Sequence, residues 1–159
     1  MRIAFAADHA GAALKDALLR RLRDTEPDHA YVDLGGDGSD PDDDYPDFAQ
    51  RLGQAIQAGD ADRGILICGS GVGASVAVNK MRGVRSAVCH DTYSAHQGVE
   101  HDDMNVLCLG SEVVGPSLAR ELVAAFLTAQ FDGGQRYVER LLKVAAMERM
   151  MKDGEVTAS

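Results

Sequence analysis

The sequence predicts an α/β fold: a three-layer, doubly wound, five-stranded parallel sheet of Rossmann-like type with an extra C-terminal helix. Strand and helix patterns alternate along the 159 residues, the order that crossovers between parallel strands produce. The strand candidates are apolar almost throughout, as expected for a sheet buried on both faces. The length fits one domain, taken as residues 1–150, which can bury roughly two-thirds of its unfolded surface.

The first half of the chain predicts two strand–helix pairs. Residues 2–7 form a short apolar run, and Leu14, Leu18 and Leu22 then recur at helical spacing within 11–24. Residues 30–34 predict the second strand, which two glycines close. A second helix is expected over 46–58.

The second half repeats the alternation. Strands are predicted over 64–68, 84–89 and 104–109, and each is followed by a helix, over 72–80, 92–100 and 116–129 respectively. A last helix over 135–152 follows the complete sheet, and residues 153–159 are expected to form a flexible tail.

Composition excludes several functional classes. The chain has 16 Lys and Arg against 25 Asp and Glu, a net charge of −9, which would repel the phosphates of nucleic acid. No apolar run is long enough to span a membrane, and Asp8 interrupts the N-terminal run too soon for a secretion signal. Cys68, Cys89 and Cys108 lie in apolar runs and indicate reduced thiols in a cytoplasmic protein.

One acidic run, residues 37–47, holds six aspartates. It lacks the central Gly and terminal Glu of an EF-hand loop. We therefore expect a solvated loop with Asp47 near a helix N-terminus.

The chemically capable residues gather where the predicted strands end. They follow the five strands at Asp8-His9, 35–36, 69–73, His90-Asp91 and 110–112. Ligands of doubly wound sheets bind beyond the carboxyl ends of the strands, near the point where the strand order reverses. If the first strand pairs with the third, Asp8, His9 and Cys68 converge there.

The turn Gly69-Ser70-Gly71-Val72-Gly73 after the third strand predicts an anion site, because glycines let backbone N–H groups turn inward beside a helix N-terminus. The run also fits Gly-x-Gly-x-x-Ala, with Asp91 about twenty residues on, as in a dinucleotide site. A nicotinamide- or nucleotide-binding module is therefore one alternative. Cys68 favours an enzyme instead, because a thiol beside a helix N-terminus should have a lowered pKa and could abstract a proton.

His101 is a second acid/base candidate, whereas His96 is interpreted as a solvated helix residue. The spacing of His90, His96 and His101 does not place them on one helix face, so no metal site is assigned. Arg136 and Arg140 lie one helical turn apart, as in a phosphate clamp. The last helix has no obvious partner except a second copy of the chain, so a homodimer is expected.

The sequence resembles type B ribose-5-phosphate isomerases and the related galactose-6-phosphate isomerase subunits over residues 2–150. Six motifs in order carry the resemblance: Ile3…Asp8-His9-Ala10-Gly11, Asp44-Tyr45-Pro46, the run 64–73, Asn79-Lys80, Thr92-Tyr93-Ser94-Ala95, and Asn105-Val106-Leu107 followed by Gly110. The resemblance implies a cofactor-free aldose–ketose isomerase that acts through a cis-enediolate. It also implies a homodimer, or a tetramer, with shared active sites.

The resemblance also implies the roles of single residues. Cys68 is the base, Ser70 and the N–H groups of 69–73 hold the enediolate oxygens, and His101 opens the sugar ring. The implied substrate-binding residues are Asp8, His9, Tyr45, Gly69, Gly71, Val72, Gly73, Asp102, Glu112, Arg136 and Arg140, the two arginines coming from the partner subunit.

Two of these positions depart from the family pattern. Asp102 stands where the family commonly has Asn, and Glu112 where it commonly has an Arg that binds phosphate. A carboxylate there would repel a phosphate. The expected substrate is ribose 5-phosphate, and a tetrose phosphate, a hexose 6-phosphate or a free sugar is the alternative.

Overall fold

The computed structural model describes residues 1–154, with side chains to Met150. The five strands are β1 (Arg2–Ala7), β2 (Ala30–Asp33), β3 (Arg63–Cys68), β4 (Ser86–Val88) and β5 (Val106–Gly110). The helices are α1 (Ala12–Thr25), α2 (Tyr45–Ala58), α3 (Val72–Val78), α4 (Thr92–Asp102), α5 (Pro116–Thr128) and α6 (Gln135–Gly154). Every predicted element is present. The predicted tail lies outside the described residues from residue 155 on.

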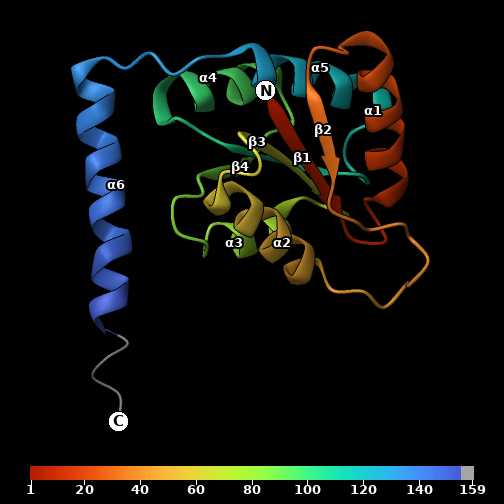
Figure 1. The fold of residues 1–159 in the computed structure, drawn as a ribbon, viewed down its shortest axis with the longest axis horizontal. Coiled ribbons are helices and arrows are strands. Elements are labelled where there is room, and N and C mark those ends of the chain that lie inside the picture. Colours follow the sequence, from red (N-terminus) through yellow and green to blue (C-terminus); the bar gives the residue numbers. More distant parts are fainter. Residues whose placement is uncertain (155–159) are drawn as a thin grey trace.

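All five strands are parallel, in the order β2-β1-β3-β5-β4 (Figure 1). The doubly wound fold is confirmed, and so is the pairing of β1 with β3, in which Ala7 lies opposite Ile67. In the next pair Cys68 lies opposite Gly110. The residues after β1, β3 and β5 therefore share one edge of the sheet, which we name the carboxyl edge.

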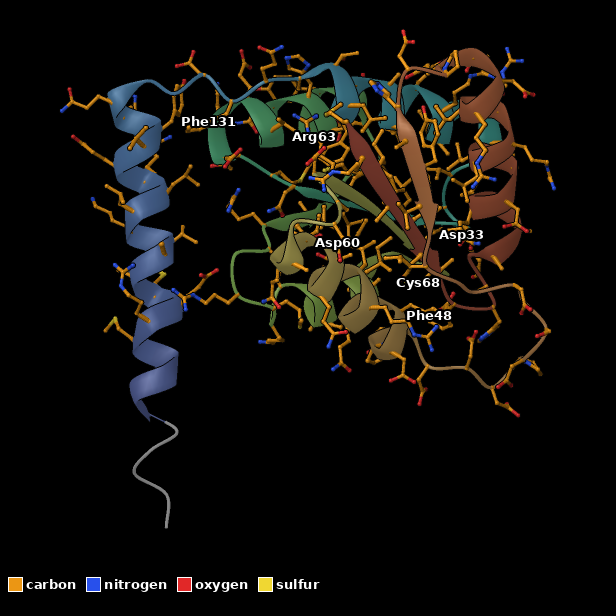
Figure 2. All side chains as sticks on the ribbon, in the orientation of Figure 1. Asp33, Phe48, Asp60, Arg63, Cys68 and Phe131 are labelled. Atoms are coloured by element: carbon orange, nitrogen blue, oxygen red, sulfur yellow. The ribbon has the colours of Figure 1, made fainter. Side chains whose placement is uncertain are left out.

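Alternate residues of each strand pack on opposite faces of the sheet. Ile3, Phe5, Ile65, Ile67 and Leu107 pack with apolar side chains of α1, α4 and α5. Ala4, Ala6, Leu66, Cys68 and Cys108 pack with α2 and α3 on the other face. The Cys68 side chain therefore points toward the α2/α3 layer, at the end of β3 (Figure 2).

Four predicted strands differ from the structure at an end, and the one predicted over 64–68 begins at Arg63. The strand predicted over 84–89 is only Ser86–Val88. Val84 lies in a turn before it, in which the Val84 N–H donates to Met81 O. The strand predicted over 30–34 ends at Asp33, and the one predicted over 104–109 runs from Val106 to Gly110. Each error is one or two residues at the end of an element, where strand boundaries are least well defined by the pattern.

Helix α6 stands apart from the three layers (Figure 1). It follows the linker that contains Phe131 (Figure 2), and its described side chains include the exposed apolar residues Val138, Leu142, Val144, Met147 and Met150. No helix among residues 1–154 is long and apolar enough to cross a membrane.

Candidate active site

Cys68 lies at the carboxyl edge with a backbone donor aimed at its sulfur. Its side chain is buried, and Gly71 N–H donates to Sγ over 3.1 Å. Gly71 has φ +80°, and an added Cβ would lie 2.9 Å from the backbone of Leu109. Only glycine fits this turn, which carries the chain from β3 into α3 and directs an N–H at the thiol.

The other members of the turn contact residues of α2 and α3. Ser70 is exposed, and its Oγ accepts from Val72 N over 3.2 Å. A Cβ on Gly73 would lie 2.8 Å from Cζ of Tyr45, so the Tyr45 ring lies directly against the start of α3. The first residue of α2 thus forms a wall beside the glycine turn.

Asp8 and His9 reach the same edge, with different surroundings. Asp8 is buried, and its Oδ1 accepts from Gly11 N over 3.0 Å, which fixes the turn into α1. His9 is exposed, and both its backbone N and its ring Nδ1 contact Oδ1 of Asp43, at 2.9 and 2.7 Å. This hydrogen bond to the Asp43 carboxylate raises the pKa of His9 above its ordinary value of 6.5.

The sequence predicted that the acidic run is a solvated loop. In the structure the run is not uniformly exposed. Asp43 is largely covered by its contact with His9, with 14% of its side chain exposed, and Asp47 lies in the first turn of α2 as predicted. All six aspartates border a hollow of about 520 Å³ with Phe48 and Arg51. This hollow does not include Cys68, and its charge disfavours an anion.

Glu112 lies beside the glycine turn. Its backbone N donates to Gly69 O over 3.0 Å, and a Cβ on Gly69 would lie 3.7 Å from its Oε1. The carboxylate is exposed and therefore faces any ligand that enters above the turn.

His101 and Asp102 do not lie at this edge of their own chain. Helix α4 starts after β4 at the carboxyl edge and runs back, so its last residues lie near the start of β5. Its 11 residues span roughly 16 Å at the helical rise per residue. His101 therefore does not lie beside Cys68 of its own chain, because α4 is antiparallel to the strands.

Arg136 and Arg140 lie with His101 rather than with Cys68. Both are exposed on α6, and Tyr137, which follows Arg136, stacks on the His101 ring at 4.4 Å between centroids. Arg140 and Asp102 border one hollow of about 320 Å³ between α6 and the body. The predicted site residues thus form two groups, one at the carboxyl edge and one where α4 meets α6.

The family model described as Ribose/Galactose Isomerase matches residues 3–144. The chain belongs to this family. It is 43% identical to ribose-5-phosphate isomerase B of Escherichia coli over 148 residues, 93% of this chain and 97% of that one. It is 40% identical to the D-erythrulose-4-phosphate isomerase of Pectobacterium atrosepticum, covering 84% of this chain and 87% of that one.

The solved structures agree. Ribose-5-phosphate isomerase B of Mycoplasma genitalium, solved with bound ribulose-5-phosphate, superposes with a TM-score of 0.86 at 40% identity, covering 93% of this chain and 96% of that one. The chain is therefore an aldose–ketose isomerase. The alternative of a nucleotide-binding module loses its basis, because the glycine turn follows β3 rather than β1.

Three neighbours of the site received no role from the sequence. His90, two residues after β4, accepts from Gly110 N through Nε2 at 3.1 Å. Ser111 Oγ donates to Ala10 O at 2.8 Å and lies 3.2 Å from Cys68 O. Asp43 was hidden within an acidic run. The sequence had already placed His90 after a strand, but its contact with Gly110 depends on the pairing of β4 with β5.

Proposed function

We propose that this isomerase interconverts ribose 5-phosphate and ribulose 5-phosphate, with Cys68 as the base. The observation that carries the proposal is the Cys68 thiol at the carboxyl edge, with Gly71 N–H directed at its sulfur. Backbone N–H groups and the start of a helix favour a negative charge there. Relatives named for ribose 5-phosphate and for D-erythrulose 4-phosphate support a phosphorylated sugar.

The reaction needs one proton moved between neighbouring carbons. In the open-chain aldose, the Cys68 thiolate removes the proton from C2, the electrons form the C1–C2 double bond of the enediolate, and the proton of the O2 hydroxyl passes to O1. The same sulfur then delivers the proton to C1 as O2 becomes the ketone oxygen. Ser70 and the N–H groups of 69–73 stabilise the enediolate oxygens, which is the electrostatic contribution that lowers the barrier most.

Ring opening and phosphate binding are assigned to the second group of residues, supplied by a partner subunit. His101 exchanges a proton with the sugar as the bond between C1 and the ring oxygen breaks. Arg136 and Arg140 hold the phosphate together with His9 of the first subunit, while Asp8 and Tyr45 contact the sugar and Asp102 lies beside His101. A homodimer in the cytoplasm unites the two groups that one chain keeps apart. Its interface includes the exposed apolar side chains of α6.

The function is tested by measuring isomerisation of ribose 5-phosphate, erythrose 4-phosphate, a hexose 6-phosphate and free ribose by the purified protein. We expect ribose 5-phosphate to have the highest kcat/KM. Cys68→Ala should lower its kcat by ~10²–10⁴-fold, the usual contribution of a positioned base. Cys89→Ala, which removes an equally buried thiol, is the control. Undiminished turnover by Cys68→Ala would exclude Cys68 as the base.

A further inference from the structure

Both ring nitrogens of His101 have partners that the resemblance did not assign. Gln97, one helical turn earlier on α4, places Nε2 2.7 Å from Nδ1 of the ring. Tyr137 of α6 places its hydroxyl 3.2 Å from Nε2 and stacks its ring on the imidazole at an interplanar angle of 18°. The position and orientation of the imidazole are therefore fixed from two helices.

These partners suit a group that both takes and gives a proton. A tyrosine hydroxyl donates to a neutral imidazole nitrogen and accepts from a protonated one. The Gln97 amide does the same when it turns over, because its two ends are a donor and an acceptor. Among the described residues, the carboxylate nearest to Nε2 is that of Glu100, whose Oε2 lies 3.7 Å away. His101 can thus change its protonation state without losing a hydrogen-bond partner.

Tyr137 also links His101 to the arginines proposed to bind phosphate. It lies between Arg136 and Arg140 on α6. The linker before α6 is anchored at the same place, since Asp132 N donates to Glu100 O over 2.9 Å. The contact that orients His101 is therefore also a contact that positions the phosphate-binding end of α6 on the body.

We propose that Tyr137 and Gln97 are positioning residues that hold His101 for opening the furanose ring of the sugar phosphate. The proposal rests on the proposed function, in which His101 performs that step. It predicts that loss of the Tyr137 hydroxyl impairs the reaction of a cyclic sugar. The proton transfer at Cys68 does not need the ring to open and is left intact.

Tyr137→Phe is the informative change, because phenylalanine keeps the stack and removes only the hydroxyl. Its kcat for ribose 5-phosphate should fall about threefold to tenfold, the usual effect of one lost hydrogen bond. Ribulose 5-phosphate cannot close a furanose ring, since its O5 is phosphorylated. Exchange of its C1 proton in D₂O, followed by NMR, therefore reports Cys68 alone and should keep the wild-type rate. Gln97→Leu should give the same pattern, and His101→Asn a stronger form of it.

Tyr93→Phe is the matched control, since Tyr93 lies on α4 with 74% of the residue exposed. A purely structural Tyr137 would lower the thermal midpoint and reduce ring-dependent turnover and C1 exchange together, which would overturn the proposal. So would a Tyr137→Phe enzyme indistinguishable from Tyr93→Phe. If the wild type does not isomerise ribose 5-phosphate at all, the proposed function has failed instead.

Discussion

At the residue scale, three buried cysteines illustrate how surroundings decide chemistry. Burial raises the pKa of Cys89 to about 11 and that of Cys108 to about 12, so both remain protonated thiols at neutral pH. Cys68 is buried too, but it ends its strand and meets the N–H of Gly71. In the sequence, Cys68 alone of the three is followed by a glycine turn.

His9 is a case that the sequence did not reveal. The position after β1 is visible in the pattern, but its partner Asp43 lies 34 residues away within six similar aspartates. The path of the loop decides which of these carboxylates contacts His9. No periodicity encodes that path.

This pair predicts a pH effect on substrate binding. The pKa of His9 is raised chiefly by its hydrogen bond to Asp43, so the imidazolium persists to higher pH than 6.5 and is lost only as the pH rises through the raised value. Asp43→Asn should return the pKa toward 6.5, and KM for ribose 5-phosphate should then begin to rise at a lower pH than in the wild type. The same sign applies to stability: the contribution of the pair is present at low pH and fades as His9 deprotonates.

The measurement is a KM-against-pH profile from pH 6 to 9, together with NMR titration of the His9 ring. Asp42→Asn is the control, since Asp42 is exposed in the same run. Superimposable profiles for the two variants would show that Asp43 does not govern the charge of His9.

At the element scale, the loops of the carboxyl edge are bonded to one another. Ser111 N donates to Cys68 O at 2.9 Å and Glu112 N to Gly69 O at 3.0 Å, while Ser111 Oγ reaches Ala10 O after β1. The alternation of strands and helices was enough to predict which loops meet here. The hydrogen bonds between the loops were not predictable, since they depend on backbone positions set by strand register.

Glu112 belongs to this bonded unit, and its charge is expected to limit phosphate affinity. Glu112→Gln keeps the shape and removes a negative charge beside the glycine turn. The KM for ribose 5-phosphate should fall about threefold to tenfold, as weakened repulsion between partly solvated charges would give, with a smaller change in kcat. Glu121→Gln, at an exposed position on α5, controls for net charge. If Glu112→Gln leaves KM unchanged or raises it, the phosphate does not bind near Glu112.

At the scale of the whole molecule, the proposed site residues of one chain form two separate groups. Cys68 and the glycine turn end the sheet, whereas His101, Arg136 and Arg140 gather where α4 meets α6. The sequence revealed both sets of residues and the unpartnered last helix. It could not show that the antiparallel course of α4 separates His101 from Cys68, because that separation follows from the three-dimensional path of the crossover.

If a dimer brings the two groups together, two inactive variants should complement each other. Cys68→Ala and His101→Asn should each be nearly inactive as pure proteins on ribose 5-phosphate. When equal amounts are mixed and allowed to exchange subunits, half of the dimers become hybrids, and each hybrid regains one intact site out of two. Activity should therefore return to about a quarter of the wild-type value, as expected for a two-fold symmetric dimer with shared sites. If each site were built within a single chain, every subunit in the mixture would stay defective. The activity of the mixture would then remain at the average of the two variants.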